Sequence, residues 1–147
     1  MPIQPKAHPM TMTSAFNETA EPRRDLRQAM WRGFRGRCPH CGEGRLFGRF
    51  LKVESACSRC GEDFHHHRAD DLPAYLVIVI VGHIAVGGLV FTETEADWPL
   101  WLQVVLWPSL ALALSVALIQ PVKGAVVGLQ WALRMHGFGR KPLGGER

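Results

Sequence analysis

Two pairs of cysteines followed by two long uncharged stretches predict a small zinc ribbon of β-hairpin knuckles, fused to an α-helical transmembrane hairpin and a C-terminal amphipathic helix. The chain has 147 residues, enough for one ordinary domain or for a small module with a membrane anchor. Its formal net charge of +4 is unevenly distributed, because residues 72–122 contain no Lys or Arg. The sequence is therefore divided into basic ends and an apolar middle.

The predicted metal site uses every cysteine in the chain. They form two C-x2-C pairs with fifteen residues between them: Cys38, Cys41, Cys57 and Cys60. This spacing is typical of a tetrahedral four-thiolate zinc site, which leaves no open position for substrate. Iron in a rubredoxin-like site would use the same ligands. Two disulfides or a redox-active pair are less favoured, because the flanks indicate a reducing cytoplasm and no βαβ pattern is visible. We predict structural Zn²⁺, with iron as the alternative.

The ribbon is predicted to occupy residues 31–71, after a flexible tail over residues 1–30. Arginines are dense between residues 23 and 37, with Trp31 and Phe34 among them. Such a segment can bind nucleic acid, but beside a membrane span we favour contact with the anionic leaflet. Apolar residues between the cysteine pairs are expected to form a short hairpin that covers the metal: Leu46, Phe47, Phe50, Leu51 and Val53. A module this small needs metal to fold.

Histidines raise the question of a second metal. His65, His66 and His67 follow the ribbon directly, and His83 lies near the middle of the first uncharged stretch. Adjacent residues on a strand or helix cannot all face one ion, so we favour a polar link for the first three. His83 is either a ligand or proton relay, or a hydrogen-bonding group against the partner helix, and the second role is favoured.

The two spans are predicted at residues 72–91 and 100–120, with an acidic loop over residues 92–99. About twenty residues suffice to cross the hydrocarbon core. Pro108 should kink the second span, and Ala113 and Ala117 could let the helices approach closely. Lys and Arg flank the pair but are absent from the loop, which predicts both termini and the ribbon in the cytoplasm. The alternative, a soluble helical hairpin, would need a core that the chain does not supply.

An amphipathic helix is predicted over residues 121–136, lying in the membrane interface with Trp131 as its anchor. Gly124 and Gly128 form a G-x-x-x-G motif, which alone is a weak signal for contact between helices. Residues 137–147 are Gly-rich and basic and are expected to be a mobile tail.

The ordered motifs resemble the bacterial membrane proteins grouped as domain-of-unknown-function family 983. They are the segments Cys38-Pro39-His40-Cys41-Gly42, Cys57-Ser58-Arg59-Cys60-Gly61, Asp70-Asp71-Leu72-Pro73 and Pro121-Val122-Lys123-Gly124. The family pattern has Asp-Gly-Pro where this chain has Asp71-Leu72-Pro73. The resemblance implies a zinc ribbon and two helices in the bacterial inner membrane, and no known activity. The genomic setting of some members is similar to that of accessory genes for cytochrome oxidase assembly.

Catalytic motifs are missing from the sequence: there is no Ser-His-Asp set and no Gly-rich phosphate loop. We therefore predict a membrane-anchored interaction or assembly-accessory protein rather than an enzyme. Its expected partners are the lipid bilayer and either another membrane protein or a second copy. One alternative is copper or iron handling, with extra ligands from His65, His66, His67 and His83. A second is a membrane-tethered nucleic-acid binder that uses the arginines of residues 23–37.

Overall fold

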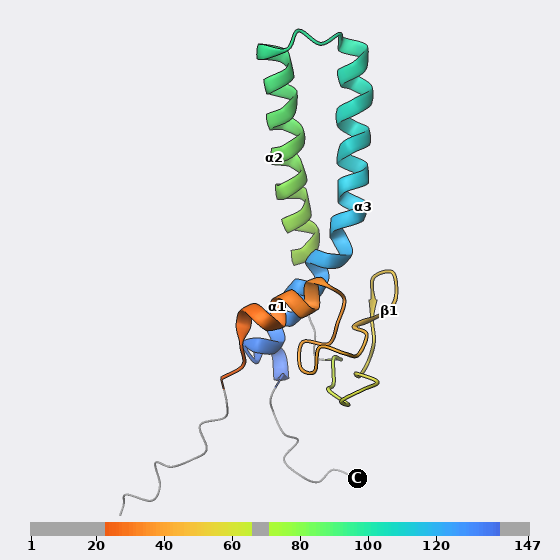
Figure 1. Ribbon diagram of the computed structural model, residues 1–147, viewed down its shortest axis with the longest axis vertical. Coiled ribbons are helices and arrows are strands. Elements are labelled where there is room, and N and C mark those ends of the chain that lie inside the picture. The colour runs from red at the N-terminus through yellow and green to blue at the C-terminus, as the bar shows by residue number, and fades with distance from the viewer. Residues whose placement is uncertain (1–22, 66–70, 139–147) are drawn as a thin grey trace, which may run out of the picture.

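The computed structural model describes residues 23–65 and 71–138. In chain order the elements are helix α1 (Leu26–Phe34), strands β1 (Phe47–Arg49) and β2 (Lys52–Val53), helices α2 (Leu72–Glu95) and α3 (Leu100–Ala132), and the 3-10 helix η2 (Met135–Gly137). Figure 1 shows α2 and α3 side by side as a long hairpin, with α1 and the strands gathered at its base. The predicted fold class is confirmed: a cysteine-bearing β-hairpin joined to two long apolar helices.

The helical hairpin is long enough to cross a bilayer. α2 has 24 residues and α3 has 33, which correspond to about 36 Å and 50 Å at 1.5 Å per residue. Both helices meet the length and composition of a membrane span. In their most apolar windows only 11% of α2 and 6% of α3 are buried within the structure. α2 also continues to Glu95, so half of the segment predicted as the acidic loop is helical.

The second helix differs from the prediction at its C-terminal end. Instead of a span that stops at residue 120 and a separate amphipathic helix, α3 is one helix that contains both Pro108 and Pro121. Figure 1 shows that α3 bends in its blue C-terminal part, where it meets α1. Proline removes one backbone hydrogen bond and forces a kink, but packing on the following turns stabilises the continuation. Val126, Val127 and Trp131 are the buried apolar residues there.

A polar network joins α2 and α3 near the closed end of the hairpin. Thr92 donates a hydrogen bond to the Gln103 side chain (3.1 Å), and Gln103 donates to Glu93 (2.7 Å) and to the carbonyl of Trp98 (3.0 Å). Trp107 Nε1 donates to the Thr92 hydroxyl at 3.3 Å. Thr92 and Gln103 are buried, so this network fixes the pairing of the helices.

The small residues expected to bring the two spans together do not do so. Ala113 and Ala117 are exposed on α3. The close approach lies instead at Gly88, where a Cβ atom would overlap the Trp107 ring. A small residue permits contact only on the face that meets the other helix, and the alanines lie on another face.

Part of the segment predicted as a flexible tail over residues 1–30 is helical, because α1 begins at Leu26. Asp25 caps the helix by accepting a hydrogen bond from the Gln28 backbone at 3.1 Å. α1 then packs on the end of α3 at small residues: a Cβ on Gly33 would overlap the carbonyl of Gly124, and one on Gly128 would overlap that of Ala29. The G-x-x-x-G motif therefore does mediate a helix contact, with α1 as the partner. Residues 1–22 and 139–147 of the predicted tails lie outside the described residues.

Candidate metal centre

The four cysteine sulfurs form a compact cluster. All four Sγ atoms lie within 4.8 Å of one another. Cys38 Sγ is 3.7 Å from Cys60 Sγ, and Cys41 Sγ is 3.8 Å from Cys57 Sγ. In a tetrahedral thiolate site with bonds of about 2.3 Å, the sulfurs would be about 3.8 Å apart. The cluster therefore has the dimensions to hold a metal ion, with both cysteine pairs contributing.

Each cysteine pair is shaped by the same backbone turn. The N–H of Gly42 donates to the carbonyl of Cys38 at 2.8 Å, and the N–H of Gly61 donates to that of Cys57 at 2.9 Å. Both glycines have positive φ, 78° and 73°, which other residues adopt at a cost. A second hydrogen bond closes each loop, from the N–H of Cys38 to Gly44 and from that of Cys57 to Glu62, both at 2.8 Å. The result is two matching knuckles that face each other.

Backbone groups and burial set the protonation of the thiols. Hydrogen bonding from the Gly44 N–H lowers the pKa of Cys41 to about 6, whereas burial raises the pKa of both Cys38 and Cys60. Gly44 also has to be small, because a Cβ there would overlap Cys57 Sγ. The thiolate is the form of cysteine that binds metal, so the lowered pKa of Cys41 favours its metal-binding form at neutral pH.

The predicted hairpin between the knuckles is present, but of its five apolar residues only Leu46, Phe47 and Val53 are buried. β1 and β2 pair antiparallel with Phe47 opposite Val53. Leu46, Phe47 and Val53 are buried, while Phe50 at the turn is 55% exposed. The buried residues belong to one core with Ala29 of α1, Phe64, Phe138 and three residues of α3: Val126, Val127 and Trp131. The ribbon therefore completes its core with both flanking helices instead of standing alone on a flexible link.

Trp131 is not the interfacial anchor that the sequence predicted. It is 6% exposed, and its Nε1 donates a hydrogen bond to Glu62 Oε1 at 2.7 Å, next to the second knuckle. The Arg24 guanidinium lies 4.2 Å from the centre of the Trp131 ring and donates to the Trp131 carbonyl at 2.7 Å. The centre of the His40 ring, on the first knuckle, lies 5.7 Å from the centre of the Trp131 ring. This tryptophan ties α3 to both halves of the metal centre.

Two arginines of the basic segment have structural roles that the sequence did not indicate. Besides Arg24, Arg32 donates to the carbonyls of Pro39 (3.2 Å) and His40 (2.7 Å) in the first knuckle. Glu62, which accepts the hydrogen bond from Trp131, is a third charged residue with a structural role here. Its position directly after Cys60 and Gly61 is the one feature of the sequence that placed it at the metal centre.

Neither His65 nor His83 joins the cysteine cluster. His65 Nδ1 pairs with Asp63 Oδ2 at 3.0 Å on the surface. His83 is exposed on α2 and hydrogen-bonds the carbonyl of Val79 in its own helix at 2.7 Å, so the predicted bond to the partner helix is not formed. His66 and His67 lie outside the described residues. Within residues 23–65 and 71–138, the four cysteines are the one set of three or more His, Cys, Asp and Glu ligands close enough for a metal ion.

A family model matches this chain over residues 47–131, and its description reads "Protein of unknown function (DUF983)". The match begins at β1 and ends at Trp131, so it includes Cys57, Cys60, both apolar helices and the part of α3 that packs against the ribbon. No curated protein and no solved structure matches the chain.

Proposed function

The chain belongs to the DUF983 family of proteins of unknown function, and from that premise we propose that it is a membrane-anchored zinc-ribbon interaction protein of the bacterial inner membrane. It would present its ribbon to a partner membrane protein or to a second copy of itself, as an accessory to assembly. One observation carries the proposal: the ribbon and the end of α3 share a single core, so the cysteine module is held rigidly against the apolar hairpin.

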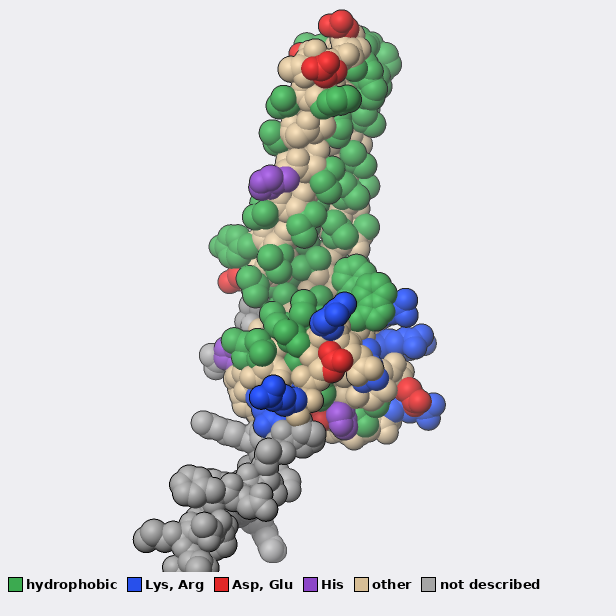
Figure 2. Space-filling view, turned by 60° about the vertical axis from the view of Figure 1, so that its left-hand side comes forward, with side chains coloured by type: hydrophobic (Ala, Val, Ile, Leu, Met, Phe, Trp, Pro, Cys, Tyr) green, Lys and Arg blue, Asp and Glu red, His purple; other side chains and the backbone are tan. Residues whose placement is uncertain are grey.

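Membrane placement is supported by what the hairpin leaves uncovered. Large apolar side chains such as Ile78 (66% exposed), Phe91 (62%) and Leu100 (72%) point outward, and a hydrocarbon phase would remove this surface from water. Figure 2 shows Lys and Arg gathered at the base of the hairpin and acidic residues at its far end. By the positive-inside rule this distribution favours a base on the cytoplasmic side and an outer loop around Asp97.

An interaction role follows from the chemistry of four thiolates. Such a site saturates Zn²⁺ with protein ligands, so the ion stabilises the fold and has no position for a substrate. Four sulfur ligands in a tetrahedron also favour zinc among divalent ions in the cell, with iron the nearest competitor. The outer surface of the ribbon, including Phe50, remains exposed for contact with another protein.

The test is co-purification of the tagged full-length chain from membranes in mild detergent, with metal analysis on the same sample. The matched control is Cys41→Ser/Cys60→Ser, which removes one ligand from each knuckle and leaves the two apolar helices α2 and α3 unchanged. We expect one zinc per parent chain and a partner that is recovered with the parent and lost from the variant. A respiratory oxidase is the first complex to assay, and a differently tagged second copy reports self-association. Equal recovery of the same complexes with parent and variant would reject an interaction role for the ribbon.

Membrane topology is tested separately. A cysteine placed at Ala96, in the turn between α2 and α3, should react with an impermeant maleimide added outside intact cells, whereas one placed at Lys52 on the ribbon should react only after lysis. Reaction of the Lys52→Cys variant in intact cells would reverse the proposed orientation. Recovery of the parent chain in the soluble fraction without detergent would contradict membrane anchoring.

A further inference from the structure

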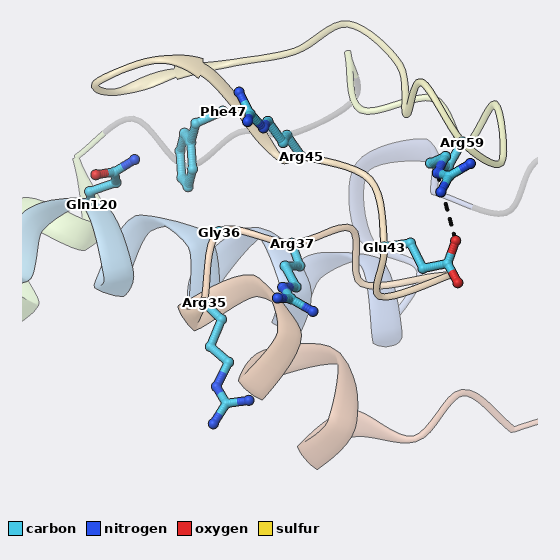
Figure 3. Close-up of a pocket in the computed structure, with 8 residues that line it drawn as sticks. All are labelled: Arg35, Gly36, Arg37, Glu43, Arg45, Phe47, Arg59 and Gln120. Atoms are coloured by element: carbon cyan, nitrogen blue, oxygen red, sulfur yellow. Dashed lines mark ion pairs between the residues drawn. The ribbon is translucent and has the colours of Figure 1, made fainter.

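A basic cavity lies where the ribbon meets the base of the hairpin. It has a volume of about 550 Å³, within the usual range for small-ligand sites. Four arginines line it: Arg35, Arg37, Arg45 and Arg59. Phe47 supplies an apolar side chain, and Gln120 is the lining residue that comes from α3. Figure 3 shows that they come from two facing segments: Arg35 and Arg37 flank Gly36 on one, while Arg45 and Phe47 come from the other. The cavity is an open one, lined by two neighbouring segments of the ribbon together with Arg59 and with Gln120 of α3.

The charges around this cavity are poorly balanced. Glu43 is the acidic residue in its lining, and it already pairs with Arg59 at 3.7 Å. Arg37 and Arg45 are backbone partners in an antiparallel bridge, and Figure 3 shows their side chains leading to opposite sides of it. Their positive charges therefore add to a basic surface that an anion would neutralise. Guanidinium groups are also the side chains that best match the geometry of phosphate oxygens.

The position of the cavity identifies the kind of anion. Gln120 belongs to α3 at the end of its long uncharged stretch, so the cavity lies at the boundary between the apolar hairpin and the basic ribbon. Trp31 and Phe34 stack beside it with ring centres 5.7 Å apart, and the Arg35 guanidinium lies 4.6 Å from the Trp31 ring centre. Both aromatic residues are exposed, as expected for side chains at headgroup level.

We propose that this cavity binds the phosphate group of an anionic phospholipid headgroup. The inference rests on the membrane placement proposed above. Phosphatidylglycerol or a related lipid would place its phosphate against the arginine-lined wall of the cavity and its acyl chains along the apolar side of α3. A free phosphorylated anion offers the same chemistry, so the experiment includes both sources.

The experiment uses the zinc-loaded full-length chain in a neutral detergent, with binding followed by isothermal titration calorimetry. The probes are short-chain phosphatidylglycerol, short-chain phosphatidylcholine and inorganic pyrophosphate. The test variant is Arg37→Gln/Arg45→Gln. The control is Arg27→Gln/Arg49→Gln, which removes the same charge from two exposed arginines of α1 and β1 that do not line the cavity. Zinc content is measured for each variant to show that the ribbon has folded.

We expect the parent to bind phosphatidylglycerol in preference to phosphatidylcholine. The test variant should bind about thirtyfold more weakly, the effect of removing two arginines near an anionic lipid, while the control stays within about fivefold of the parent. Equal losses in both variants would overturn the cavity as the site and indicate a diffuse surface charge. Binding of pyrophosphate without phosphatidylglycerol would overturn the lipid source, and no binding of either anion would overturn the proposal. A chain without this lipid site would still be recovered in the membrane fraction. A negative binding result would therefore refute the lipid site without refuting the proposed membrane-anchored function.

Discussion

Replacing Gly124 by alanine tests whether the ribbon depends on its contact with α1 and α3. The added methyl group would overlap the Gly33 carbonyl and lie 3.3 Å from the Phe47 ring. Backbone atoms cannot rotate away, so the helices must separate at a cost near the upper end of the usual ~1–3 kcal/mol for overpacking. Alanine recovers up to about 1 kcal/mol in helix propensity. The net expectation is destabilisation by about 2 kcal/mol.

The assay is alkylation of the cysteines of the metal-loaded chain by iodoacetamide, followed by mass spectrometry. When opening and closing are fast relative to alkylation, the labelling rate follows the population of the open ribbon, so about 2 kcal/mol corresponds to roughly thirtyfold faster labelling. Gly87→Ala is the matched control, because a Cβ at Gly87 meets nothing within 4 Å. Its labelling should equal that of the parent. Labelling of Gly124→Ala at the parent rate would refute the shared core as the support of the metal centre.

Four further outcomes are expected. Cys38→Ser should lose the metal and open the ribbon while the chain stays in the membrane fraction, as measured by metal analysis of that fraction. Burial raises the pKa of Cys38, so its thiol keeps its proton at neutral pH and metal binding should release protons, seen as a buffer-dependent heat in calorimetry; the metal should dissociate as the pH falls. Trp131→Phe should cost about 1–3 kcal/mol by removing the hydrogen bond to Glu62, read from the same labelling rate. Thr92→Val should weaken the helix pair by about 0.6 kcal/mol in detergent unfolding, more than Thr94→Val, which loses bonds only within α2.

Each of these outcomes has a clear contrary result. Retention of stoichiometric metal by the serine variant would show that the fourth sulfur is dispensable. A binding heat that is independent of the buffer would mean that the thiols carry no protons to release. Identical labelling of Trp131→Phe and the parent would reduce the tryptophan to simple packing, and equal stability of the two threonine variants would show that the network around Gln103 does not hold the hairpin together.

The elements that could be predicted from sequence are those with local signals. The cysteine spacing predicted the cluster, and the uncharged stretches predicted α2 and most of α3, because ligand spacing and apolar length are read directly along the chain. The association between the ribbon and α3 was not predicted. In the sequence, a tryptophan after an apolar stretch looks the same whether its ring lies against lipid or against Glu62. The bend of α3 and its close contact with α1 determine which environment Trp131 occupies.

The prolines gave a misleading boundary for a related reason. Pro121 marks a helix end in isolation, since it removes a backbone donor, but the packing of Val126 and Val127 against the ribbon outweighs that local preference.

The roles of the individual arginines likewise could not be predicted from the sequence. Arg32 supports a knuckle and Arg37 lines a cavity, although both belong to one basic run.

The shared core also fixes the order in which the molecule can be completed during synthesis. Residues 38–60 leave the ribosome first, but Val126, Val127 and Trp131, which close over them, emerge only after both apolar helices have been made. At about 5–20 residues per second, the thiols wait several seconds without their cover. In the membrane placement proposed above, a copy whose helices fail to insert would keep an unfinished ribbon open to proteases, so a protected metal centre would mark a chain that has already inserted.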